Sequence, residues 1–171
     1  MKIRKFIAVT TWYDYILEVG AFLFVLSSII YFIWFWVTAP DVIPIHFNFK
    51  GEADNYGSKT ILVLIPIISI LLYIALSVVA KNPRFINIPV KITKENETSI
   101  FKIAITITRI LKPMICGMFL FILWHIKNFD GKDTADNTFL IIMSIFLGGM
   151  ILCVVVGIIK MVLIEDKNKK R

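Results

Sequence analysis

The residues best suited to chemistry lie in one short polar stretch between two apolar runs. His46 lies between Asp41 and Asp54. An imidazole and two carboxylates are ligands that a zinc-like ion accepts, but their spacing matches no metal motif. We therefore favour a structural role, in which His46 and Asn48 tie a hairpin together by hydrogen bonds and Asp54 caps a turn. A sensor of external pH is a third interpretation of His46, because histidine changes charge between about pH 5 and 8.

Charged residues near the ends of apolar runs form a second set of candidates. Asp14 and Glu18 are four positions apart, so they share one helix face and could pair with Arg109 or Lys112 across a helix interface. We favour such pairing over proton transfer, because no Asp or Glu lies in the middle of an apolar run. Lys59 lies just before the second run, at its outer end, and could bind a lipid phosphate or a peptide carboxylate, although an interfacial anchor is the commoner role.

Motifs for catalysis are missing from the sequence. It contains no Ser-His-Asp set, HExxH, Walker loop or GxGxxG. Cys116 and Cys153 both lie inside apolar runs, so we interpret them as packing residues. We therefore assign no catalytic residue, no metal ligand and no cofactor.

Four apolar runs must position these residues. The chain has 171 residues, 58% of them hydrophobic, and only 18% are charged, compared with about 25% in soluble domains. The runs, at about 16–37, 61–80, 108–127 and 138–162, are long enough to cross a hydrocarbon core about 30 Å thick, and in lipid they must be helical. The sequence predicts an all-α integral membrane protein with a single membrane domain over residues 1–171.

The distribution of charge predicts the orientation. Most basic residues precede the first run, separate the second and third, or follow the fourth, whereas in the other two connections acidic residues outnumber basic ones. By the positive-inside rule, both termini are expected to be cytoplasmic. The net charge of +7 is thus explained by orientation in a lipid bilayer, which is the predicted partner. We predict no direct contact with nucleic acid.

The third run carries polar residues at both ends. Its helix is expected to begin before the apolar residues, with Thr93 as a cap, and Glu95, Asn96 and Glu97 suit the positive N-terminal end of a helix. His125 lies at the other end and is expected to face the outer interface.

Residues 39–59 have the composition of a compact hairpin on the outer membrane face, directly after the first helix. Pro40 and Pro44 favour extended backbone, and Gly51 and Gly57 permit turns.

This loop resembles the signature of the domain of unknown function 1648 (DUF1648) family, an xPxxIPxHFNxxGxxDxxGSK stretch that follows the first span. The matching residues are Pro40, Ile43, Pro44, His46, Phe47, Asn48, Gly51, Asp54, Gly57, Ser58 and Lys59. Residues 87–96 resemble the family's inner loop, and Tyr13-Asp14 with Glu18 resembles its usual start of the first span. The resemblance covers roughly residues 12–126.

Bacterial immunity proteins of the sporulation delaying protein system are related to this family. They protect the membrane from a secreted toxin and hold a transcriptional repressor at the membrane once toxin is bound. The resemblance implies a binding protein, not an enzyme, whose partners are a secreted toxic peptide and a cytoplasmic regulator. The implied binding residues are Pro40, Pro44, His46, Asn48, Gly51, Asp54 and Lys59. The alternative is a small membrane enzyme or transporter subunit with a site made by His46, Asp54 and Lys59.

Overall fold

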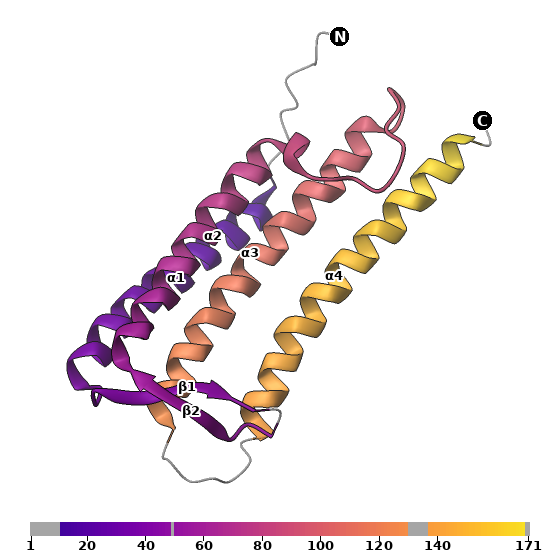
Figure 1. The fold of residues 1–171 in the computed structure, drawn as a ribbon. Coiled ribbons are helices and arrows are strands. Elements are labelled where there is room, and N and C mark those ends of the chain that lie inside the picture. The colour runs from indigo at the N-terminus through magenta and orange to yellow at the C-terminus, as the bar shows by residue number, and fades with distance from the viewer. Residues whose placement is uncertain (1–10, 49, 130–136, 170–171) are drawn as a thin grey trace.

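Four long helices and one β-hairpin make up the described part of the chain, residues 11–48, 50–129 and 137–169 of the computed structural model (Figure 1). The elements in chain order are α1 (Trp12–Thr38), β1 (Val42–Phe47), β2 (Ala53–Ser58), the 3-10 helix η1 (Lys59–Val63), α2 (Leu64–Lys81), the 3-10 helix η2 (Pro83–Phe85), α3 (Glu97–Asn128) and α4 (Asn137–Lys169). Each predicted span lies within a helical segment, so the four predicted helices are confirmed. The hairpin after α1 is also confirmed.

The helices have apolar surfaces that suit a hydrocarbon solvent. Four helical segments, Trp12–Thr38, Lys59–Lys81, Glu97–Asn128 and Asn137–Lys167, are long and apolar enough to cross a membrane. In the most apolar part of the last segment, 0% of the residues are buried inside the protein. A soluble protein of this size would have to cover most of these side chains. The fold therefore agrees with a multi-pass membrane protein.

Helix α3 is the centre of the bundle. It packs against α1, α2 and α4, whereas the main contacts of α4 are with α3. Figure 1 shows α4 alongside the other three helices, at one side of them. The hairpin lies at one end of the bundle, and the start of α1 and the end of α4 lie towards the opposite end.

The start of α3 differs from the prediction. Asn96, not Thr93, is the residue that precedes the first helical turn. The Asn96 side chain accepts a hydrogen bond from the Thr93 amide at 2.7 Å and donates one to the Lys91 carbonyl at 2.9 Å. Asn96 is only 1% exposed, so its amide group is used to fix the connector before the helix. The helix begins at the next residue, Glu97.

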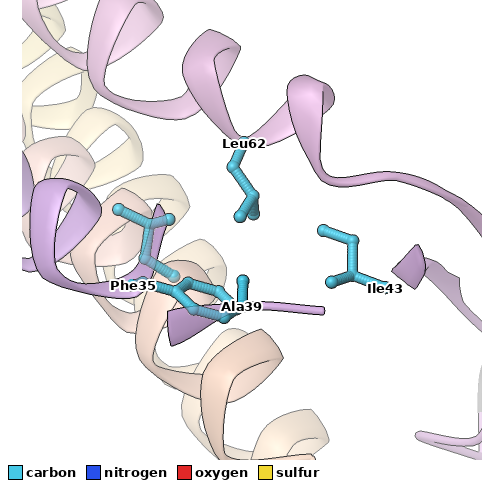
Figure 2. Packing of buried hydrophobic residues seen from close by; sticks show 5 residues of the cluster. Phe35, Ala39, Ile43 and Leu62 are labelled. Atoms are coloured by element: carbon cyan, nitrogen blue, oxygen red, sulfur yellow. The ribbon is translucent and has the colours of Figure 1, made fainter. Parts of the chain in front are cut away.

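The hairpin is attached to the helices by a small apolar core. Phe35 and Ala39 of the α1 end, Ile43 of β1, Leu62 of η1 and Leu123 of α3 form one buried cluster (Figure 2). Ile43 lies near the start of β1 and Leu62 follows β2, and they are 2% and 0% exposed. Both strands are therefore fixed to the bundle at the base of the hairpin. The sheet is antiparallel and pairs Val42 with Ser58 at one end and Phe47 with Ala53 at the other.

Candidate functional site

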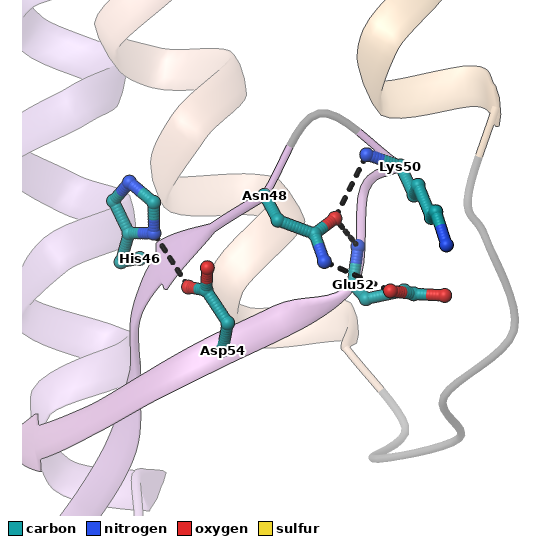
Figure 3. Close-up of polar contacts among 5 residues, drawn as sticks. All are labelled: His46, Asn48, Lys50, Glu52 and Asp54. Atoms are coloured by element: carbon teal, nitrogen blue, oxygen red, sulfur yellow. Dashed lines mark hydrogen bonds and ion pairs between the residues drawn. The ribbon is translucent and has the colours of Figure 1, made fainter.

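Asn48 organises the turn of the hairpin (Figure 3). Its Oδ1 accepts hydrogen bonds from the backbone amides of Lys50 at 2.8 Å and Glu52 at 3.1 Å. Its Nδ2 donates to Glu52 Oε2 at 2.8 Å. Gly51 adopts a φ of 80°, a left-handed conformation that glycine takes without steric cost. The hydrogen-bonding role predicted for Asn48 is therefore confirmed.

His46 and Asp54 form a pair across the two strands. His46 Nδ1 lies 2.5 Å from Asp54 Oδ1, and the side chains are 64% and 43% exposed. Figure 3 shows the imidazole and the carboxylate pointing toward one another from β1 and β2. The prediction that His46 ties the hairpin together is confirmed, but Asp54 pairs with His46 while Asn48 holds the turn.

Lys59 closes the base of the hairpin. Its Nζ lies 3.2 Å from Asp41 Oδ1 and donates to the Ala39 carbonyl at 3.3 Å. The ammonium group is also 5.7 Å from the centre of the Trp36 ring, within the range of a cation–π contact. Pro40 lies between Ala39 and Asp41 and is exposed. Lys59 thus joins the end of α1 to the start of α2.

The two pairs lie at different ends of the hairpin. Lys59 follows Ser58, which pairs with Val42, whereas His46 is opposite Asn55 near the turn. About four residues of strand at about 3.3 Å each separate these positions, or roughly 13 Å. Asp41 pairs with Lys59 and not with His46. Among the described residues, no group of three His, Cys, Asp or Glu side chains could hold a metal ion.

Phe47 links the hairpin to α3 and α4, a contact that the sequence did not predict. Its ring centre lies 4.7 Å from that of His125, 5.4 Å from that of Phe129 and 5.3 Å from that of Phe139. His125 is also stacked on Phe139 at 4.2 Å. The expectation that His125 faces the outer interface is wrong: it is 4% exposed, because Phe47 and Phe139 cover it. The four-residue spacing of Phe121 and His125 places both rings on one helix face, but nothing in the sequence connects them with Phe47.

Two ion pairs at the opposite end of the bundle join α1 to α3. Arg109 Nη1 lies 2.8 Å from Asp14 Oδ2, and Lys112 Nζ lies 2.6 Å from Glu18 Oε2. The predicted pairing of these four residues is confirmed. Lys112 is 1% exposed, and its ammonium group also donates to Ser77 Oγ of α2 at 2.9 Å. These charges are therefore used to hold helices together.

Comparison with known proteins identifies the region that contains the hairpin. Residues 23–70 match the family described as "Domain of unknown function (DUF1648)". The match begins inside α1, includes the hairpin and ends inside α2, so it contains every predicted binding residue. No curated protein and no solved structure matched the chain at a significant level.

Proposed function

Because residues 23–70 match the DUF1648 family, we propose that this chain is a multi-pass membrane protein whose hairpin binds a membrane-active peptide. The observation that carries the proposal is a strand pair with exposed polar groups, fixed by a buried core to one end of a bundle of apolar helices. A rigid, exposed hairpin at that position would meet a peptide as it reaches the bilayer. On the basis of the family resemblance, we propose that binding of the peptide protects the cell from a secreted toxin.

The proposed orientation places the hairpin outside the cell and both termini in the cytoplasm of a bacterium. Lysines are abundant at the bundle end opposite the hairpin, including the exposed Lys91 and Lys94 of the connector. Positive residues favour the cytoplasmic side of an inner membrane. Labelling of Lys50→Cys, but not of Lys94→Cys, by an impermeant thiol reagent in intact cells is the expected result. The opposite pattern would reverse the orientation.

The edge of β2 offers a place for an extended peptide. Within the described residues the sheet has two strands, so the outer edge of β2 carries backbone groups that no third strand pairs. Asp54, Asn55 and Tyr56 are exposed on β2. Addition of a peptide strand to such an edge supplies main-chain hydrogen bonds, and neighbouring side chains supply specificity.

The exposed side chains of the hairpin suit an amphipathic peptide. Val42 and Tyr56 are 63% and 49% exposed, and the His46–Asp54 pair lies on the same hairpin. Apolar and polar groups are thus available together.

In the proposed signalling role, the basic connector between α2 and α3 contacts a cytoplasmic regulator.

A survival assay tests recognition by the hairpin. A sensitive bacterium would produce the wild-type protein, a His46→Ala/Asp54→Ala variant, or a Lys50→Ala control at matched membrane levels, under challenge by toxic membrane peptides. The exposed pair contributes little to folding, so loss of protection in the double variant alone would support recognition by these side chains. Equal protection by all three proteins would argue against it.

The His46–Asp54 pair also supports a second candidate function. A carboxylate that orients an imidazole is a common arrangement in metal sites and in general-base catalysis. In that case the chain is a small membrane enzyme or transporter subunit with its site at the hairpin. A reproducible one-to-one metal content in purified protein, lost on His46→Ala, would favour this function over peptide binding.

A further inference from the structure

A groove lies between α3 and α4, away from the hairpin core. Its volume is about 490 Å³. Apolar side chains form most of its walls, among them Ile103 and Ile110 of α3 and Leu152 and Val156 of α4. Lys102 and Lys160 also line it. The groove therefore combines a long apolar surface with two cationic groups.

The two lysines share one end of the groove. Because α3 and α4 run in opposite directions, Lys102 near the start of α3 and Lys160 near the end of α4 come to the same level. Ile110, at the other end of the α3 wall, is about 12 Å further along the helix. Both lysines are exposed, and neither is in an ion pair with a described residue. Their charges are thus available to a ligand.

The inner side of the groove is closed by close contact between the helices. A Cβ atom placed on Gly157 would overlap the Ile107 side chain, so α4 lies directly against α3 here. Glycine at this position permits the approach. The open side consequently faces the surroundings of the bundle, which in a bilayer are lipids.

We propose that this groove binds one anionic phospholipid. An acyl chain lies along Ile110, Leu152 and Val156, and the phosphate lies between Lys102 and Lys160. A zwitterionic lipid would gain the same apolar contact with weaker attraction to the lysines, and a free phosphate would gain no apolar contact. The site requires that the helices span a bilayer, which is part of the proposed function, but it is independent of any ligand of the hairpin.

Lipid titration followed by native mass spectrometry tests the site. Purified protein in detergent would be titrated with phosphatidylglycerol or phosphatidylcholine carrying the same acyl chains. Tighter binding of phosphatidylglycerol is expected for the wild type. Lys102→Ala/Lys160→Ala should weaken phosphatidylglycerol binding about tenfold or more, because each lysine near an anionic lipid contributes appreciably, and should change phosphatidylcholine binding little.

Three further variants separate this site from general charge attraction. Lys94→Ala/Lys167→Ala removes the same charge from exposed lysines outside the groove, and it should keep the preference. Lys102→Arg/Lys160→Arg should also keep it. Cys153→Phe fills the apolar part and should weaken binding of both lipids.

Equal loss in the two alanine double variants, or an unchanged preference in Lys102→Ala/Lys160→Ala, would overturn the proposal. Unchanged lipid binding in Cys153→Phe would overturn the assignment of the acyl chain to the groove. Extraction of the wild-type protein from membranes by alkaline carbonate would instead contradict the membrane-spanning part of the proposed function. Failure of the hairpin to protect cells would leave the lipid site unaffected.

Discussion

Lys112 of α3 donates hydrogen bonds to both carboxylate oxygens of Glu18 of α1, at 2.7 and 2.6 Å. The same ammonium group donates to Ser77 of α2 at 2.9 Å and lies 5.0 Å from the centre of the Tyr73 ring. One positive charge therefore joins three helices. The two partners differ in environment, since the Lys112 side chain is 1% exposed and that of Glu18 is 37% exposed.

This difference predicts unequal effects of removing each partner. Glu18→Gln leaves the Lys112 charge buried without a carboxylate. We expect the free energy of unfolding to fall by about 1 to 3 kcal/mol, less than for an ion pair with both partners buried, because Glu18 is partly exposed. Lys112→Met leaves a carboxylate that can reach water, so its loss should be smaller. Thermal unfolding of the detergent-solubilised protein measures both.

The double variant Glu18→Gln/Lys112→Met serves as the control for this pair. It removes both charges, so it should recover part of the stability lost in Glu18→Gln. A larger loss for Lys112→Met than for Glu18→Gln would show that the ammonium group contributes chiefly through Ser77 and Tyr73.

Two glycines of α4 should respond differently to alanine. At Gly157 an added Cβ would overlap Ile107, whereas at Gly148 no atom lies within 4 Å of it. Gly157→Ala should reduce stability by about 1 to 3 kcal/mol through overpacking. Gly148→Ala should be neutral or stabilising, by up to about 1 kcal/mol. Unfolding of both variants under the same conditions measures the contrast.

Relief of the overlap gives a check on that mechanism. Ile107→Ala combined with Gly157→Ala should be less destabilised than the sum of the two single changes. Simple addition of the two losses would mean that α4 does not lie against Ile107 in solution.

The helices could be predicted from the sequence because a bilayer leaves few alternatives for long apolar runs. The third span was predicted at 108–127 within a helix that begins earlier, near Thr93, and α3 begins three residues later than this predicted cap suggests, with Asn96 as the cap and Glu97 as its first residue. Its first turns alternate buried Ile100 and Ala104 with exposed Lys102, so they are amphipathic and are fixed by packing on the connector.

The candidate site was predictable where the signal is local. The residue types of Asn48 and Gly51 predicted a turn, and both residues form it in the structure. The contact of Phe47 with His125 joins segments far apart in the sequence, and no periodic pattern connects them. The pairing of Asp14 and Glu18 with Arg109 and Lys112 lies between these cases: charges near lipid require partners, but the individual partners depend on how α1 and α3 pack.

Leu62 should be essential for attachment of the hairpin. It is 0% exposed and packs with Phe35 and Ile43, whereas the nearby Leu64 is 51% exposed. Leu62→Ala should lower stability by about 2 to 5 kcal/mol and speed amide hydrogen exchange in residues 42–58. Leu64→Ala is the matched control and should change neither by much. Equal exchange rates in the two variants would indicate that other contacts hold the hairpin.

Asn48 should determine whether the turn stays closed. Asn48→Ala removes the acceptor for two backbone amides and the donor to Glu52, and we expect the hairpin to lose about 1 to 2 kcal/mol of local stability. The buried core around Ile43 and Leu62 is distant from the turn, so thermal unfolding of the helices should change little. Hydrogen exchange resolved to the turn residues measures the local effect, and Lys50→Ala, which removes an exposed side chain but keeps the backbone amide, is the control. Unchanged exchange in Asn48→Ala would show that the strand pairing alone keeps the turn closed.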